Sequence, residues 1–226
     1  MRTPFLYILL FALSCKNSSN ERVVVSKIDS FISNSDTVLY FPKDSFFLVS
    51  DSTNKEGDIA LKSEFSKLLQ SLDEPLIYNT KASDTNNSLR LLWIRAFENP
   101  IIMRISSTKN KYQLMIKEAK KEYYNDNDYK YVKVKDSLIS ISEKEWENIL
   151  DALDKQNFSR VPISDQLGLV EDATHWIFEV KLNSNYRCIT RVFFNKKSLQ
   201  NYIYIDKMLQ LSKPYISLEE KRLNDK

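Results

Sequence analysis

The stretch LRLLWIRAFENPIIMRIS, residues 89–106, decides the fold. Aliphatic and aromatic residues fill both halves of it, which predicts two strands at Leu89–Phe97 and Ile101–Ser106. The segment between them, residues 98–100, is too short for a crossover connection but suits a hairpin turn. We therefore expect these two strands to be antiparallel neighbours in one sheet.

The same pattern recurs further along the chain. Lys111–Ala119 and Tyr129–Lys135 alternate between apolar and polar residues, which predicts two more antiparallel strands joined by an Asn/Asp-rich turn at 125–128. His175–Leu182 and Tyr186–Phe194 predict a later hairpin with a short Asn-Ser-Asn turn. The sequence therefore predicts a four-stranded meander and a separate hairpin.

Amphipathic helices are expected to cover this sheet. Ser142 and Glu145 match a capping box that opens a helix. The apolar face of this helix consists of Trp146, Ile149, Leu150 and Leu153. Leu199–Leu209 predicts a last helix before Pro214. Strands in runs, with short turns and few intervening helices, indicate an α+β fold with an antiparallel sheet and a few amphipathic helices packed on it.

The region before residue 89 predicts a smaller α/β part at 22–82, ahead of the main α+β domain at 89–215. The elements expected in it are β-prone runs at 23–25, 38–41 and 46–49, a polar loop at 50–58, and a helix capped by Ser63 and stopped by Pro75. Polar residues at 82–88 mark the boundary between the two parts. The tail at 216–226 is charged and expected to fray.

The composition narrows the chemistry that this chain can perform. The 226 residues carry a formal net charge of +3, and this near-neutral balance gives no electrostatic footprint for nucleic acid. Two isolated glycines, Gly57 and Gly168, cannot form a phosphate-binding loop. One histidine and two cysteines cannot supply a usual zinc site. We expect no cofactor and no metal, although counting leaves a carboxylate-only calcium or magnesium site open.

The first residues have the layout of an export signal. Arg2 precedes an unbroken apolar run, Phe5–Leu13, whose nine residues reach roughly half of a ~30 Å hydrocarbon core. Such a run is too short to cross a bilayer and is typical of a signal peptide. We expect residues 1–14 to be removed and residues 15–21 to form a polar tether. An ordinary secretory signal, which would release the protein, is the alternative.

The segment Ala12-Leu13-Ser14-Cys15 resembles the lipobox of bacterial lipoproteins. The resemblance implies cleavage after Ser14, diacylglycerol on the Cys15 thiol, and acylation, such as with palmitate, of the new amino terminus. Two or three acyl chains hold a protein stably on a membrane. The resemblance thus implies a bacterial cell-envelope location, periplasmic or surface-exposed, with the membrane as a partner. Lipidation of Cys15 would leave Cys188 without a disulfide partner within the chain.

Tryptophan and arginine residues on two predicted strands form one candidate binding face. Trp93 and Arg95 share a face of one strand, and Trp176 lies on another. An arginine among aromatic rings can stack on a ring or hold a carboxylate, so such a face could bind a saccharide or a peptide. The alternative, which we favour, is a sheet face covered by helices, with Arg95 paired to a core carboxylate such as Glu179.

His175 is a candidate general base at the start of a strand, since Glu171 and Asp172 precede it and could orient it. Many surface histidines have the same surroundings, and no motif marks a nucleophile. A lipid-anchored hydrolase that uses His175 is therefore the enzymatic alternative for this chain, which we otherwise expect not to be an enzyme.

Tyrosines and lysines interleave around the turn of the second predicted hairpin. The tyrosines are Tyr123, Tyr124, Tyr129 and Tyr131, and the lysines are Lys120, Lys121, Lys130 and Lys133. Tyrosine gives a large, rigid contact area at low entropic cost, so it suits interfaces. The solvent-exposed face of a hairpin has the same pattern, and we favour this interpretation. If the chain has a protein-binding patch, this region is the strongest candidate.

Residues 89–212 are similar to a group of small bacterial lipoproteins of unknown function. The similarity lies in Leu92–Phe97, Pro100–Ile105, the helix with Trp146, and the later run Trp176–Glu179. It implies an exported protein and no particular activity. The leading hypothesis is a lipid-anchored, non-enzymatic binding or interaction module of the cell envelope. A structural envelope protein is a further alternative.

Overall fold

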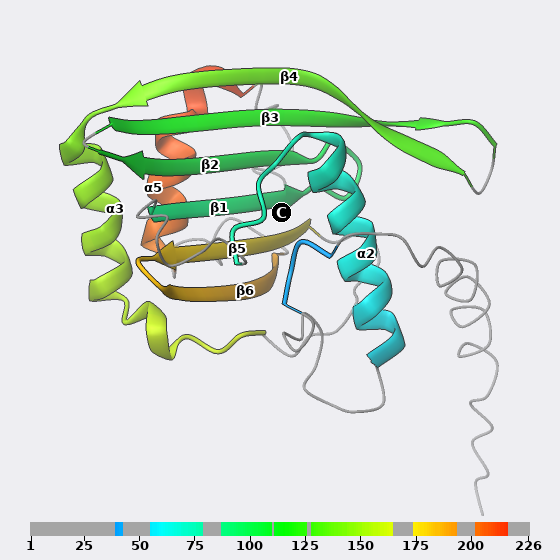
Figure 1. The fold of residues 1–226 in the computed structure, drawn as a ribbon. Coiled ribbons are helices and arrows are strands. Elements are labelled where there is room, and N and C mark those ends of the chain that lie inside the picture. The colour runs from blue at the N-terminus through cyan, green and yellow to red at the C-terminus, as the bar shows by residue number, and fades with distance from the viewer. Residues whose placement is uncertain are drawn as a thin grey trace, which may run out of the picture. The chain divides into compact units, whose positions relative to one another are not determined.

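A six-stranded antiparallel sheet forms the centre of the fold (Figure 1). The computed structural model describes residues 39–42, 55–78, 87–109, 111–125, 128–164, 174–193 and 202–216. The strands are β1 (Asn87–Ile94), β2 (Ile101–Thr108), β3 (Lys111–Tyr123), β4 (Tyr129–Ile141), β5 (Thr174–Leu182) and β6 (Asn185–Phe193). They lie in the order β4-β3-β2-β1-β5-β6, so β4 and β6 are the terminal strands. The predicted α+β class with an antiparallel sheet is confirmed.

β1 is a central strand because it pairs on both sides. Leu91 lies opposite Met103 of β2 and opposite Phe178 of β5. The first pairing follows from the predicted hairpin, whereas the second joins segments that are far apart in sequence. β1 is shorter than predicted because its last paired residue is Ile94, before the residues that form the turn.

The hairpin of β3 and β4 continues beyond the rest of the sheet, as Figure 1 shows. β2 pairs with β3 up to Glu118, whereas β3 and β4 stay paired as far as Tyr123 and Tyr129. Their register shifts between Glu118 and Ala119. Both strands are longer than predicted. The extension of β3 past Ala119 lies at this end, where lysine, glutamate and tyrosine replace the apolar alternation of the earlier part. The extension of β4 past Lys135 lies at the opposite end, where it pairs with Tyr112–Lys117 of β3.

One face of the sheet packs against two helices, α3 (Glu143–Lys155) and α5 (Ile203–Ser212) (Figure 1). The core between them is apolar and aromatic; its largest members are Trp93, Met103, Trp146, Phe158, Trp176, Phe178 and Tyr204. The predicted capping box is confirmed. Ser142 Oγ accepts from the backbone N–H of Glu145, and the Glu145 carboxylate accepts from the backbone N–H of Ser142.

The other face packs against α2 (Lys55–Ser71) and the segments at 39–42 and 72–78. The apolar residues that meet there include Phe41, Leu68, Leu69, Leu72, Leu92, Ile102 and Ile177. Adjacent residues on one strand, such as Leu91 and Leu92, therefore serve opposite cores, because side chains alternate across a strand. Among the described helices, none combines the length and apolar character that a membrane span needs.

The predicted start of α2 was wrong. The helix begins at Lys55, so Ser63 lies inside it and the part of the predicted polar loop from Lys55 onward is helical. Asp58 and Lys62, one turn apart, form a buried ion pair with 2.8 Å between Nζ and Oδ2. Such a pair supports a helix without adding to the apolar periodicity on which the prediction relied.

Other N-terminal predictions fall partly outside the described residues. The β-prone runs at 23–25 and 46–49 lie outside them. The described part of the run at 38–41 forms a bend and not a strand. There the backbone N–H of Tyr40 donates to Ser66 Oγ of α2 at 2.9 Å, a contact with a helix side chain in place of a strand partner. The last helix starts at Ile203, later than the predicted Leu199, which lies outside the described residues.

Candidate functional site

The two tryptophans of the predicted binding face are neighbours in the core. Trp93 on β1 lies opposite Trp176 on β5, and their ring centroids are 5.4 Å apart. Their exposed fractions are 7% and 2%, because α3 and α5 cover this face of the sheet. The structure thus brings the two rings together as predicted, but as core residues. This agrees with the covered-sheet alternative.

Arg95 has different partners from the one predicted. Its guanidinium lies over the Trp93 ring, 5.6 Å from the centroid, and it ion-pairs with Glu98 and Glu118. Arg95 Nε also donates to the Asn99 carbonyl at 2.7 Å, so the side chain closes the β1–β2 turn. Burial lowers the pKa of Arg95, and the two carboxylates oppose that shift.

The predicted pairing of Arg95 with Glu179 was wrong, because the two side chains belong to opposite faces of the sheet. Glu179 lies directly opposite Arg90 and accepts from its Nε at 2.6 Å. Arg90 and Arg95 are an odd number of residues apart, so alternation along β1 separates them.

His175 does not share a face with the tryptophans. It precedes Trp176 on β5, lies opposite Ile94 of β1 and Val192 of β6, and is half-buried. The two acidic residues that precede it in sequence, at 171 and 172, lie outside the described residues. Among the residues that the structure does describe, no three His, Cys, Asp or Glu side chains are grouped as around a metal ion.

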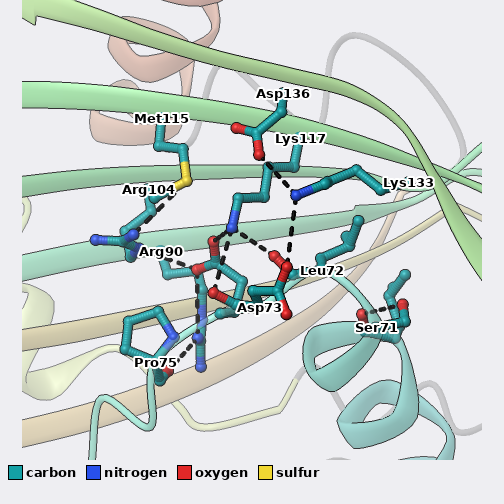
Figure 2. Close-up of polar contacts among 12 residues, drawn as sticks. Ser71, Leu72, Asp73, Pro75, Arg90, Arg104, Met115, Lys117, Lys133 and Asp136 are labelled. Atoms are coloured by element: carbon teal, nitrogen blue, oxygen red, sulfur yellow. Dashed lines mark hydrogen bonds and ion pairs between the residues drawn. The ribbon is translucent and has the colours of Figure 1, made fainter.

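A buried charge cluster, which sequence reasoning missed, joins the sheet to the turn after α2. Figure 2 shows Arg90, Arg104 and Lys117, from three successive strands, reaching toward this turn. They converge on Glu74: Arg104 Nε lies 2.9 Å from Oε2, Lys117 Nζ lies 3.0 Å from Oε1, and Arg90 Nη1 lies 3.6 Å from Oε2. The Glu74 side chain is fully buried.

The same cations also hold the backbone of that turn. Lys117 Nζ donates to the carbonyl oxygens of Leu72 and Asp73, and Arg90 Nη1 donates to the Pro75 carbonyl at 2.8 Å (Figure 2). Asp73 has a φ of 52°, in the left-handed region that residues other than glycine rarely occupy. The cluster therefore fixes the path by which the chain leaves α2.

On the other side of Arg90, the network ends in groups that are held neutral. Tyr186 donates its hydroxyl to Glu179 Oε1 at 2.8 Å, and burial together with that carboxylate raises the pKa of the Tyr186 phenol. Burial and Glu179 also raise the pKa of the Cys188 thiol well above its ordinary value. A thiol kept protonated and enclosed in this way is a poor nucleophile.

A signal for this cluster was present in the sequence. Arg90 and Arg104 lie directly opposite each other on β1 and β2, and like charges in that position repel. Two arginines in otherwise apolar strands therefore require carboxylates nearby. Glu74 is remote in sequence, so the spacing could not identify it as the partner.

The end of the β3–β4 hairpin presents tyrosines to solvent. Tyr123 and Tyr124 are 64% and 61% exposed. Lys130 Nζ lies 5.3 Å from the centroid of the Tyr124 ring, and the Tyr123 ring lies 5.5 Å from that of Tyr129. The two predicted residues Tyr129 and Tyr131 are brought together, 5.6 Å apart and nearly perpendicular at 85°.

Two further side chains complete this group, and one of them comes from α2. Tyr131 donates its hydroxyl to Glu64 Oε1, and Lys121 Nζ lies 3.3 Å from the same oxygen. Lys121 Nζ also lies 4.2 Å from the Tyr129 centroid and 5.4 Å from that of Tyr131. Burial, followed by the Glu64 charge, raises the pKa of both Tyr129 and Tyr131. Sequence reasoning missed Glu64.

Comparison with known proteins found no family model that matches the chain and no similar sequence among curated proteins. The function must therefore be argued from the geometry of the described residues.

Proposed function

We propose that this chain is a lipid-anchored, non-enzymatic binding module of the bacterial cell envelope, and that it binds a protein partner with the end of its β3–β4 hairpin. The observation that carries the proposal is the exposure of Tyr123 and Tyr124 on a hairpin that extends past the sheet. Aromatic residues are enriched in protein interfaces, and rigid tyrosines lose little entropy when they bind.

The other sequence candidates are committed to the fold. Trp93 and Trp176 are buried, Arg95 is occupied by carboxylates, and the cluster around Glu74 is closed off by the turn after α2. No observation on the described residues favours the hydrolase that uses His175. At the hairpin end, by contrast, the aromatic rings are exposed, so binding there requires no rearrangement of the core.

The anchor rests on the sequence resemblance around Cys15, which lies outside the described residues. Lipid on Cys15, followed by the polar tether at 16–21, would leave the folded unit free above the membrane. We expect intact protein from a bacterial host to lack residues 1–14 and to carry acyl mass. The Cys15→Ser protein should lose its partition into membranes, since single or absent acyl chains bind weakly. Unchanged membrane partition of that variant would refute the anchor.

The binding surface has its own test. A photoreactive phenylalanine analogue placed at Tyr124 in the full-length protein should give a discrete protein adduct in intact cells. The adduct should be lost when Tyr123→Ser is added. The matched control is the same probe at Tyr215, a tyrosine that is 38% exposed and distant in sequence. Adducts of equal yield at both positions, or an adduct that ignores Tyr123→Ser, would favour the structural envelope protein.

A further inference from the structure

The group formed by Glu64, Tyr129 and Tyr131 has the geometry of a cage for a cation. Two aromatic rings meet at 85°, with 5.6 Å between centroids, and a carboxylate closes the third side. The face of an aromatic ring attracts cations within about 6 Å of its centroid, and cages of such rings recognise ammonium groups. The carboxylate adds a charge-assisted hydrogen bond for any ammonium that carries N–H donors.

An ammonium already occupies the cage. Lys121 Nζ lies within cation–π distance of both rings and 3.3 Å from Glu64 Oε1. Its position demonstrates that the cage accepts the ammonium of a lysine side chain. The occupant comes from β3 itself, so its reach is limited by the strand to which it belongs.

The resident lysine leaves part of the cage unused. Glu64 Oε2 is buried and has no hydrogen-bond partner among the described residues. A buried acceptor without a donor is costly, and an ammonium with three N–H donors could serve both carboxylate oxygens if it were not tethered to β3. The Lys121 side chain is 37% exposed, so it can move into solvent without disturbing the core.

We propose that Glu64, Tyr129 and Tyr131 bind a lysine side chain of the partner protein, which displaces Lys121 from the cage. This inference rests on the proposed function and specifies the chemistry of its partner. A primary ammonium fits better than a quaternary one, because only the primary group can donate to Glu64 Oε2. The exposed ring of Tyr123, 5.5 Å from Tyr129, extends the aromatic wall along which the aliphatic part of the incoming lysine would lie.

The test removes the resident competitor. Full-length Lys121→Ala protein is titrated with Nα-acetyllysine amide, and the tyrosine ring signals are followed by NMR. We expect saturable binding that is about tenfold tighter than to the wild-type protein. In the wild type the ligand must first displace Lys121 and break its cation–π and ion-pair contacts, and this cost is absent from the variant. Adding Glu64→Gln should weaken this binding about tenfold or more.

Matched probes and variants make the result decisive. Lys120→Ala removes a lysine on the opposite face of β3 and should leave binding at the wild-type level. Nα-acetylnorleucine amide, which lacks the charge, should not bind. Equal binding of norleucine amide, equal or tighter binding of tetramethylammonium, or no saturable binding to Lys121→Ala protein with an unchanged melting temperature would each overturn the lysine cage. The crosslink at Tyr124 is measured separately, so the cage can fail while the binding module stands.

Discussion

Glu74 shows how one residue can join distant parts of this chain. It follows α2, and its carboxylate forms ion pairs with cationic side chains of β1, β2 and β3. Removing one member of a buried charge network leaves the others unpaired in a medium of low polarity, which costs more than the loss of an exposed pair. Loss of the Glu74 charge therefore destabilises the fold in two ways: its ion pairs are lost, and the cations that it neutralised are left unpaired.

We expect Glu74→Gln to lower the free energy of unfolding by about 3 kcal/mol, because the substitution keeps the shape but removes the charge. Urea unfolding followed by circular dichroism measures the change. The control is Glu122→Gln, which affects a half-exposed pair with Lys130 at 3.8 Å and should cost less than about 1 kcal/mol. Equal effects of the two substitutions would contradict the role given to Glu74.

Cys188 yields a second prediction at this scale. In Cys15→Ser protein, where Cys188 is the remaining cysteine, we expect a disulfide reagent such as Ellman's to leave the folded chain unmodified over minutes and to titrate one thiol after unfolding. Burial and the raised pKa both reduce the thiolate fraction that reacts. Rapid labelling under native conditions would show that the face beneath α2 is open to solvent.

At the scale of elements, α3 and α2 contrast in how well the sequence predicts them. The start of α3 is signalled locally, since Ser142 and Glu145 satisfy each other and the helix N-terminus. The start of α2 depends on a buried pair between Asp58 and Lys62 and on packing against the sheet. Capping boxes can be recognised in a sequence, whereas helices stabilised by tertiary contacts extend beyond their apolar periodicity.

The capping box gives a prediction with a pH dependence. Hydrogen bonds from Ser142 lower the pKa of Glu145 below its ordinary value of 4.5. A carboxyl whose pKa is lower in the folded state stabilises the fold fully above pH 4.5, and the contribution disappears as the pH falls through the lower, folded value. Ser142→Ala should cost about 1 kcal/mol at pH 7.

The measurement is urea unfolding of wild-type and Ser142→Ala protein at several pH values between neutrality and the acid limit. The difference in unfolding free energy should shrink as Glu145 becomes protonated. Ser140→Ala, at an exposed position on β4, serves as the control and should show no such trend. A difference that stays constant down to the lowest pH would argue against the interaction between Ser142 and Glu145.

For the whole molecule, the sequence predicts hairpins well and their assembly poorly. The turns after β1, β3 and β5 have local signals, but the pairing of β1 with β5 joins residues such as Leu91 and Phe178 that share no local motif. The residues of the candidate site also differ in how well the sequence predicts them. Tyr129 and Tyr131 stand out in the sequence, whereas Glu64 reaches them from α2 only through the tertiary fold.

The architecture also predicts an order of local stability. Amide hydrogen exchange should be slowest in β1 and β5, which are paired on both sides and buried on both faces. Among the described parts of the sheet it should be fastest in the hairpin end, residues 120–125 and 128–130. Mass spectrometry of peptides after exchange measures this order. Comparable protection of the hairpin end and β1 would mean that the end is covered, and it would contradict the exposed surface proposed for binding.

The register shift in β4 has a consequence for neighbouring molecules. β4 has 13 residues and is a terminal strand of the sheet as the described residues form it, and a terminal strand is a template on which another chain could add. The shift opposite Glu118 and Ala119 interrupts that template. Lys130, Lys133 and Lys135 also place charged side chains along the strand, which disfavours the addition of another strand. We therefore expect the irregularity to disfavour edge-to-edge pairing of β4 between copies, and so the formation of fibres at high concentration.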